Sequence, residues 1–423
     1  MAQISLKYGR SDSALEFDPS RFDVLGHDPA GAALSDVEIG DRLDNPVDSP
    51  PLEEIIHSGQ TVLVVVPDAT RQTGSGQIVN LLIRRLIANG SEPHEISLIF
   101  ATGIHRKVTD PEKAEILTPF IAQRIKTLDH DPRDLARLVN LGETTGGITV
   151  ELDRALVEHE HVVIVGGASF HYFAGFTGGR KLICPGLASN RTISATHKLA
   201  FDCQTRSRRQ GVDTGVLEGN AVHEAFMECV SKAPPSFAIT TITNDSGAIT
   251  DLSCGNWTTS HRAACDSFAA SHTVRIYERR DIVVATCGGY PHDVNIIQAH
   301  KTLDAASRAC TMGGTIVLFA DCEDGLGRPD FLDWFVPCSA EALAERLCEK
   351  YQVNGQTAWN LLRIAETHEV RIVTSLDDSV TSMMRLRKTD ATAIRDLLQK
   401  QNARGYILPA GAKFNVTTGA TSD

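Results

Sequence analysis

The chain alternates between short apolar runs and longer segments whose apolar residues recur at helical spacing. The runs rich in β-branched residues predict buried strands at 61–66, 96–100 and 161–165. Segment 77–88 has helical periodicity with Gly90 as its C′ residue, and Asp110-Pro111-Glu112 predicts a helix start with proline in the first turn. The first fifty residues, rich in Asp, Pro and Gly, indicate short strands and turns.

The same alternation resumes from about residue 269. Strands are predicted at 281–286, 315–319 and 370–374, and helices at 296–309 (closed by Gly313-Gly314), 340–350 and 391–401. Strands separated by helices imply parallel sheets with crossover connections. We therefore expect an α/β fold of two domains, each a mainly parallel sheet flanked by helices, with the active site in the cleft between them. The domains are predicted at 1–268 and 269–423, and the last segment could pack back on the first domain.

Length and charge narrow the class of protein. A chain of 423 residues is too long for one ordinary core, which favours two domains. The formal charge of -12 argues against a nucleic-acid partner, because phosphate binding needs a basic face. No apolar run approaches the roughly 20 residues that span a bilayer, and no signal-peptide core is visible near the start. We expect a cytoplasmic protein without a membrane partner.

The ten cysteines are scattered and contain no C-x-x-C pair. This spacing argues against a zinc ribbon, an iron–sulfur site or a thioredoxin motif. The length of the chain and the lack of a secretory signal also argue against a disulfide framework. We therefore expect the cysteines to be thiols that pack as small hydrophobes.

Four predicted strands run directly into unusual polar loops. These loops are Pro67-Asp68-Ala69-Thr70-Arg71, Ala101-Thr102-Gly103-Ile104-His105-Arg106, Gly166-Gly167-Ala168-Ser169-Phe170-His171 and Gly288-Gly289-Tyr290-Pro291. Ligands of open α/β sheets bind beyond the carboxyl ends of the strands. The first three loops are expected on one sheet edge, and the fourth is expected to reach them across the domain cleft.

Each candidate residue also has an ordinary structural explanation. These are a turn with a surface ion pair for Asp68 and Arg71, satisfied structural histidines for His105 and His171, and solvated side chains for Lys181 and His197. Gln298 and Lys301 stand at i and i+3, so they share one helical face. Only the joint pattern of histidines, arginine and lysine at strand ends favours a site.

The loop Gly175-Phe176-Thr177-Gly178-Gly179-Arg180-Lys181 is typical of a phosphate cradle, because glycines let backbone N–H groups approach an anion. It is not a Walker loop, since Leu182 follows the lysine. A further helix, predicted to be capped by Asn190, carries His197.

Taken together, these blocks resemble the nickel-dependent lactate racemase family. The resemblance rests on His171-Tyr172-Phe173-Ala174-Gly175, Gly178-Gly179-Arg180-Lys181, Pro185-Gly186, Thr192-Ile193, His197, Asp68-Ala69-Thr70-Arg71, Thr102-Gly103-Ile104-His105-Arg106, Gln298 and Lys301. The blocks occur in order from Asp68 to Lys301, and beyond Phe319 little is recognisable.

The resemblance implies a nickel-pincer nucleotide, which is nickel(II) held by pyridinium-3,5-bisthiocarboxylic acid mononucleotide. Lys181 would carry it covalently and His197 would complete the nickel coordination. Asp68, Ala69, Thr70, Arg71, Gly178 and Gly179 would line the cofactor. His105 and His171 would be the catalytic acid/base pair, and Arg71, Gln298 and Lys301 would bind the substrate.

The activity implied is inversion of C2 of a small 2-hydroxy acid, as a racemase or epimerase, by proton-coupled hydride transfer. Removing the α-proton beside a carboxylate is costly, whereas hydride removal coupled to loss of the hydroxyl proton gives a 2-keto acid. Two bases are needed because each enantiomer must find one, and a neutral imidazole suits this task. Cofactor-maturation proteins are the further partners implied.

Two departures from the family pattern leave the substrate open among lactate, malate, aromatic and sugar acids. Gln72 follows the arginine where proline is frequent, and Tyr290-Pro291-His292-Asp293 adds a histidine and a carboxylate. Two alternative functions remain at this stage: a lyase or aldolase using Lys181 as a Schiff base, and a non-catalytic nickel or nucleotide carrier.

Overall fold

The computed structural model describes residues 1–26, 31–69, 71–336, 339–400 and 403–419, so the predicted cofactor residue Thr70 lies outside the described residues. Contacts divide the chain into two compact units. The central unit comprises Pro29–Ala200 and Gln210–Ala270. The C-terminal unit comprises Met1–Asp28, Phe201–Arg209 and Ser271–Asp423.

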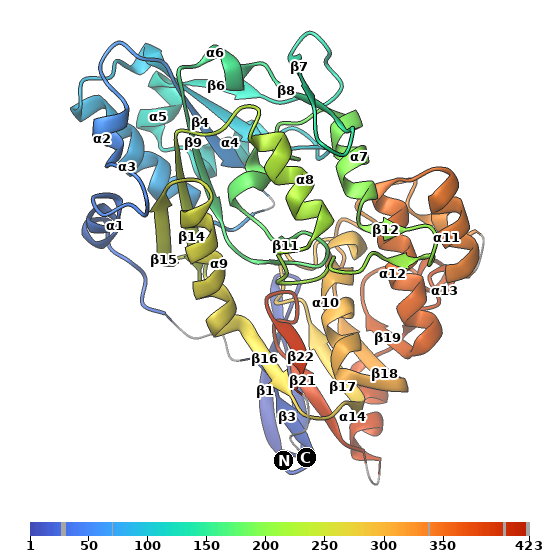
Figure 1. The fold of residues 1–423 in the computed structure, drawn as a ribbon. Helices are drawn as coiled ribbons and strands as arrows, with labels where there is room; N and C mark the ends of the chain where they lie inside the picture. The colour runs from blue at the N-terminus through green and yellow to red at the C-terminus, as the bar shows by residue number, and fades with distance from the viewer. Residues whose placement is uncertain (27–30, 70, 337–338, 401–402, 420–423) are drawn as a thin grey trace. The chain divides into compact units, whose positions relative to one another are not determined.

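The central unit is built on a six-stranded sheet (Figure 1). Its order is β15 (Ile249–Gly255), β14 (Phe237–Thr243), β9 (His161–Gly167), β4 (Val62–Pro67), β5 (Ile96–Ala101) and β6 (Lys126–Asp129). All neighbours pair in parallel except β14 and β15. The three strands predicted for this part of the chain are confirmed.

Both faces of this sheet are buried, which explains the continuous apolar runs. Along β4, Val62, Val64 and Val66 point into one core, and Leu63 and Val65 point into the other. Helices α1 (Asp36–Leu43) and α3 (Ser75–Ala88) supply apolar side chains to the first core, and α8 (Ala221–Val230) supplies them to the second.

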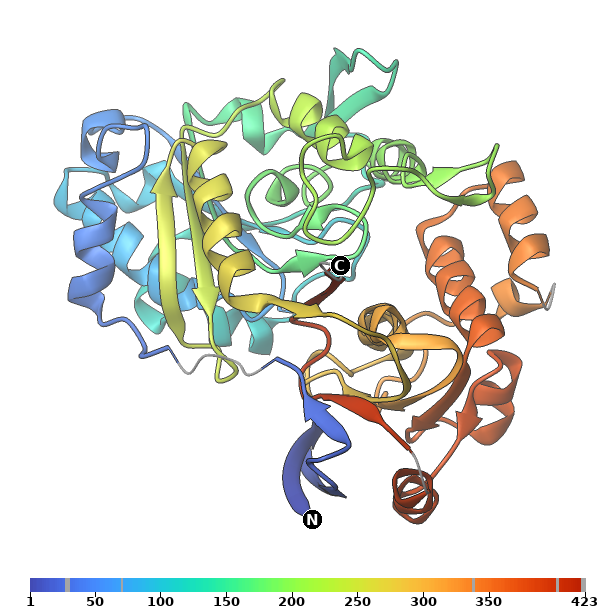
Figure 2. The ribbon, with the colours of Figure 1, turned by 60° about the horizontal axis from the view of Figure 1, so that its bottom comes forward.

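The C-terminal unit contains a six-stranded, fully parallel sheet. Its order is β20 (Arg387–Lys388), β19 (Glu369–Val373), β18 (Cys310–Phe319), β17 (Arg280–Thr286), β21 (Gly405–Leu408) and β3 (Phe22–Val24). One face packs against α10 (Ile296–Ala309), α11 (Ala340–Glu349) and α12 (Val353–Thr367). The other face packs against α14 (Ala391–Gln399) and the hairpin β1–β2 (Ala2–Tyr8, Ser11–Phe17) (Figure 2). The predicted α/β class is confirmed.

The division of the chain differs from the predicted ranges 1–268 and 269–423 at the N-terminus. Met1–Asp28 belongs to the C-terminal unit because β3 extends that sheet beside β21. The excursion Phe201–Arg209 belongs there too. The last strand, β22 (Asn415–Thr418), pairs with β16 (Thr273–Ile276) inside the C-terminal unit and does not return to the central unit. These pairings join residues far apart in sequence, which periodicity cannot reveal.

Most of the helices and strands predicted from periodicity are present, but some helix ends and one helix differ from the prediction. Gly313 and Gly314 were expected to close the helix, yet they lie inside β18, and the helix ends at Ala309. The helix α12 was not predicted. With 15 residues it is the longest helix in the described ranges. In these ranges no helix is both long and apolar enough to cross a bilayer.

The expectation that the cysteines are all thiols is wrong for two of them. Cys203 and Cys348 form a disulfide, with Cα atoms 5.6 Å apart and 145 residues between them in sequence. The excursion Phe201–Arg209 brings Cys203 to α11, which no sequence spacing discloses. The free cysteines of the described ranges are all buried, as expected of small hydrophobes.

Candidate functional site

The three polar loops of the central unit follow neighbouring parallel strands. Strand β4 lies between β9 and β5, with Val65 opposite Ile164 and Pro67 opposite Ala101. Because these strands end at nearly the same level, the loops after them share one sheet edge. The loops that carry Asp68, His105 and His171 therefore leave the sheet at the same edge, and the roles predicted for these residues stay predictions.

Asp68 and His105 are in direct contact. Nδ1 of His105 lies 2.7 Å from Oδ2 of Asp68, and the Asp68 side chain is 7% exposed whereas that of His105 is 39% exposed. A carboxylate accepts hydrogen bonds, so it favours the tautomer in which His105 carries its proton on Nδ1. The lone pair of Nε2 is then the basic site of the ring.

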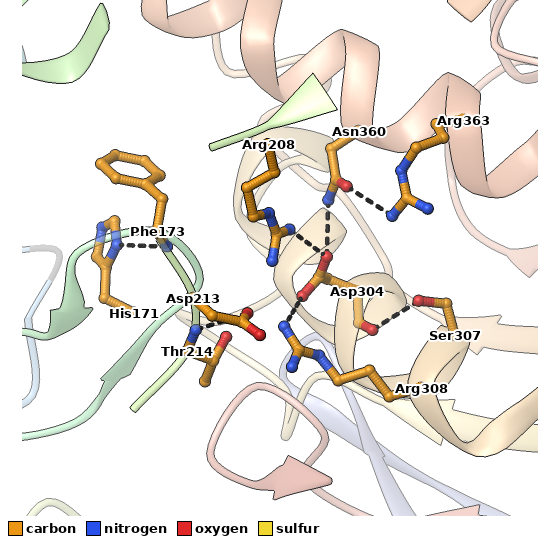
Figure 3. A network of polar contacts seen from close by, with 10 residues as sticks. All are labelled: His171, Phe173, Arg208, Asp213, Thr214, Asp304, Ser307, Arg308, Asn360 and Arg363. Atoms are coloured by element: carbon orange, nitrogen blue, oxygen red, sulfur yellow. Dashed lines mark hydrogen bonds and ion pairs between the residues drawn. The ribbon is translucent and has the colours of Figure 1, made fainter. Parts of the chain in front are cut away.

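His171 is held in the opposite tautomer by a tight hairpin of β10 (Phe170–His171) and β11 (Gly175–Phe176). Its Nδ1 accepts from the backbone N–H group of Phe173 at 3.5 Å (Figure 3) and from that of Ala174 at 3.2 Å, so the neutral ring carries its proton on Nε2. Gly175 has φ +75°, and a Cβ there would lie 2.1 Å from the Val216 carbonyl oxygen. The turn therefore requires glycine.

One aromatic ring brings the other predicted residues together. The centroid of Phe173 lies 4.4 Å from that of His171, 5.2 Å from that of His197 and 5.8 Å from Nζ of Lys181. The Phe226 ring lies 5.5 Å from His197 and 5.9 Å from Nζ of Lys181. Phe173 stood in the family motif, but sequence reasoning assigned it no role, and Phe226 carried no signal.

His197 has the form expected of a metal ligand. It is buried on α7 (Asn190–Lys198), and its Nδ1 donates to the carbonyl oxygen of Ile193 at 2.8 Å, which leaves the lone pair on Nε2. Burial and the Lys181 ammonium lower the pKa of His197 to about 3, so the ring is neutral near pH 7. The helix is capped by Ser189, which accepts from Thr192 N–H, and the predicted cap Asn190 is its first helical residue.

The glycine-rich loop is closely packed. Gly178 and Gly179 both have positive φ, and a Cβ would lie 2.8 Å from the Gly167 carbonyl oxygen or 2.5 Å from the His261 ring, respectively. The short helix η2 (Gly179–Leu182) places Arg180 in the interior and Lys181 at an intermediate depth. Packing by itself therefore requires both glycines, and their contact with a nucleotide stays a prediction.

The loop after β4 is tied to β14. Arg71 N–H donates to the Asp68 carbonyl oxygen at 3.2 Å, which closes a turn around Ala69. The Gln72 carbonyl oxygen accepts from Thr243 Oγ1 at 3.0 Å. Gln72 thus leaves the loop anchored, although it departs from the family pattern. The contacts predicted for Arg71 stay predictions.

Gln298 and Lys301 lie on α10 of the C-terminal unit. Lys301 Nζ donates to Gln298 Oε1 at 2.7 Å, so the two side chains of this helical face are in contact. Asp293, the carboxylate that departs from the family pattern, is buried and accepts from Gly9 N–H at 2.7 Å. Its contact is a structural brace within the C-terminal unit.

A buried carboxylate further along α10 was missed by sequence reasoning. Asp304 accepts from Arg208 (2.8 Å), Arg308 (3.1 Å) and Asn360 (3.0 Å) (Figure 3). Burial alone would raise the pKa of Asp304, but the two guanidiniums hold it well below its usual range. The contact between Arg208 and Asp304 links the excursion Phe201–Arg209 to α10. No local sequence motif predicts this network.

No group of three or more His, Cys, Asp or Glu side chains in the described residues is arranged to hold a metal ion.

Two domain families match the chain. Residues 8–209 match the lactate racemase N-terminal domain and residues 277–413 match the lactate racemase C-terminal domain. A lactate racemase of Thermoanaerobacterium thermosaccharolyticum is 30% identical over 339 residues, which are 79% of this chain and 78% of the relative. A lactate racemase of Lactiplantibacillus plantarum is 30% identical over 389 residues, which are 89% of this chain and 90% of the relative.

Solved structures agree with these matches. The lactate racemase apoprotein of Thermoanaerobacterium thermosaccharolyticum superposes with a TM-score of 0.87 at 27% identity, covering 98% of this chain and 100% of that one. A Thermotoga maritima protein superposes with a TM-score of 0.70 at 18% identity, covering 93% of this chain and all of that protein, and shares the fold. With both domains matched in order and two lactate racemases 30% identical over most of the chain, the chain belongs to the lactate racemase family.

Proposed function

We propose that this isomerase inverts C2 of lactate or a related 2-hydroxy acid by proton-coupled hydride transfer, with a nickel-pincer nucleotide as its resident cofactor. The observation that carries the proposal is the pair of histidines held in opposite tautomers, His105 by Asp68 and His171 by its own hairpin. The names of its relatives support the same reaction class.

The residues present fit the proposed cofactor. His197 offers a neutral imidazole whose Nε2 lone pair suits nickel, and an imidazole combines well with sulfur ligands on this metal. Lys181 places its amine beside the same two aromatic rings, Phe173 and Phe226, that flank His197. Lys181 would hold the cofactor covalently and His197 would complete the metal coordination. When bound, the cofactor supplies an acceptor and donor of hydride.

His105 is the proton acceptor of the proposed mechanism. Its Nε2 lone pair takes the proton of the substrate hydroxyl as the C–H bond at C2 is broken. The imidazolium that results is stabilised by the adjacent Asp68 carboxylate, which also keeps the ring in position. Its partial exposure lets a substrate reach it.

His171 presents an N–H group to the substrate. In the resting tautomer its Nε2–H donates a hydrogen bond that orients the substrate oxygen. A racemase must handle both mirror images, so for the other enantiomer His171 is the proton acceptor, which requires the tautomer with the proton on Nδ1 and the lone pair on Nε2. The resting structure begins with His105 as acceptor and His171 as donor.

The substrate carboxylate needs cations, and the sequence offers Arg71 and Lys301. A guanidinium provides a planar fork for a carboxylate, and an ammonium provides a point charge. The contact between Lys301 and Gln298 orients both polar groups on one face of α10. We propose that these three residues bind the substrate.

The test is to produce the full chain together with cofactor-maturation proteins and to screen 2-hydroxy acids for racemisation. A nickel-containing protein with a nucleotide adduct that inverts at least one acid, and loses this turnover in His105→Ala, supports the proposal. Loaded protein whose turnover is unaffected by His105→Ala and His171→Ala contradicts it. Borohydride trapping of a substrate carbonyl on Lys181, without any adduct, would indicate a Schiff-base enzyme instead.

A further inference from the structure

Arg180 is the largest fully buried side chain of the described residues. Its Nη2 donates to the Ala174 carbonyl oxygen at 2.6 Å, and its Nη1 lies 3.3 Å from Nε2 of His261. No carboxylate in the described residues acts on its charge, and its Nε has no hydrogen-bond partner there. Taking a guanidinium out of water is costly, so a buried arginine without a counter-charge calls for a functional explanation.

Ala174 connects this guanidinium to His171. The Ala174 carbonyl oxygen accepts from Arg180, and the Ala174 N–H donates to Nδ1 of His171 at 3.2 Å. Ala174 lies in the turn between β10 and β11, in which three residues separate His171 from Gly175. The hydrogen bond that fixes the tautomer of His171 and the bond that anchors the turn thus meet at one residue.

The opposite side of the guanidinium is also fixed. Nε2 of His261, on α9 (Thr259–His272), lies 2.9 Å from the Thr177 carbonyl oxygen as well as beside Arg180. Gly179 has no Cβ, which lets the His261 ring approach the loop. Burial, followed by the Arg180 charge, lowers the pKa of His261 to about 3, so this ring is neutral and the guanidinium is the local charge.

We propose that Arg180 is a positioning residue that holds the His171 turn at Ala174, so that in the resting protein Nδ1 of His171 is an acceptor and Nε2 is protonated. Its consequence for turnover rests on the proposed function, but its consequence for the tautomer does not. Arg180 acts through Ala174, and nothing requires it to touch the substrate.

The direct test is a tautomer measurement on the full chain without cofactor or substrate. Long-range ¹H–¹⁵N spectra of protein labelled with ¹⁵N-histidine distinguish Nδ1 from Nε2 protonation, and His171→Gln assigns the signals. The wild-type protein should show His171 protonated on Nε2. Arg180→Met should give the averaged nitrogen shifts of a ring that exchanges between tautomers.

Two further variants keep the test decisive. Arg262→Met is the matched control, because Arg262 belongs to the same unit but forms a partly exposed ion pair with Glu218. It should leave the His171 signals unchanged. If Arg180→Met does not fold, Arg180→Lys replaces it, since lysine keeps the charge but loses the fork. A folded Arg180 variant with a wild-type His171 spectrum overturns the proposal.

Turnover supplies a second, separable readout in cofactor-loaded protein. Misplacement of a catalytic group by about 1 Å costs on the order of 10²-fold in rate. Arg180→Lys should therefore lower kcat by about that factor while KM changes by less than about threefold. If the wild-type chain inverts no 2-hydroxy acid, the proposed function fails, and the tautomer result stands on its own.

Discussion

Nδ1 of His105 lies 2.7 Å from Oδ2 of Asp68, and the two residues come from the ends of adjacent parallel strands. The Asp68 carboxylate is buried, whereas the His105 imidazole is partly exposed. A ligand can therefore reach the imidazole but not the carboxylate. The same arrangement turns a histidine into a base in many hydrolases. It gives the proposed reaction its clearest test.

Asp68→Asn should remove most of the activity while leaving the fold intact. The amide can donate to Nδ1, which favours the tautomer with the proton on Nε2 and takes away the basic site. Because general-base catalysis contributes about 10²- to 10⁴-fold, kcat should fall by a factor in that range. Rates of racemisation measure the loss of activity, and the circular dichroism spectrum shows whether the fold is intact. Unchanged turnover with Asp68→Asn would show that His105 is not the base.

Lys181→Ala should abolish covalent loading of the cofactor. The amine of Lys181 is held between Phe173 and Phe226 in the central unit, whereas Lys232, an exposed lysine of the same unit, serves as the control. Intact-mass spectrometry of protein produced with the maturation proteins should show the adduct in wild type and Lys232→Ala alone. A fully loaded Lys181→Ala protein would refute the assignment.

The stability of the protein should fall as the pH is lowered from 6.5 to 5. Burial, with the Arg180 charge as a smaller cause, lowers the pKa of His261 and of His223 to about 3. The unfolded chain binds these protons near pH 6.5 and the folded chain does not, so the stabilisation is complete above 6.5 and is lost below it. Each group changes the free energy of unfolding by up to about 1.4 kcal/mol per pH unit.

His261→Gln isolates one of these contributions. Urea unfolding at several pH values between 6.5 and 5 should give a shallower decline for this variant than for wild type. His57→Gln, at an exposed position, should keep the wild-type decline. Equal slopes for His261→Gln and wild type would mean that this ring takes up its proton in the folded state.

Elements whose boundaries follow from local periodicity were predictable from the sequence. The strand β9, the helix α10 and the glycine after α3 needed only apolar spacing and turn residues. The contact between Asp68 and His105 was also predictable from the sequence, because both residues follow strands that pair in parallel. The class of fold follows from the same alternation.

Features set by long-range pairing were not predictable. The addition of β3 to the C-terminal sheet, the Cys203–Cys348 disulfide and the contact of Arg208 with Asp304 depend on residues more than fifty positions apart. The burial of Arg180 was equally hidden, since its neighbour Lys181 has the same charge and a different environment. A single sequence carries no local signal for such contacts.

Asp153→Asn should destabilise the central unit strongly. His130 and Asp153 form a buried pair with side chains 0% and 2% exposed, in which Nδ1 lies 2.8 Å from Oδ2. Nε2 of His130 lies 3.1 Å from the Ala188 carbonyl oxygen, and Oδ1 of Asp153 accepts from the Ala155 N–H at 3.1 Å. The amide of an asparagine has only one acceptor oxygen for the two donors that the carboxylate satisfies, and a buried donor left unsatisfied costs about 1–3 kcal/mol.

The control for this loss is Glu158→Gln. Glu158 pairs with Arg154 at 3.8 Å on the surface of the same unit, where an ion pair contributes about 1 kcal/mol or less. Urea unfolding followed by circular dichroism should separate the two variants by a large difference in midpoint. Because His130 also holds Ala188, which follows the Lys181 loop in the chain, Asp153→Asn should in addition reduce the fraction of protein that carries the cofactor. Equal midpoints for the two variants would show that the buried contact between His130 and Asp153 contributes no more to stability than a surface ion pair.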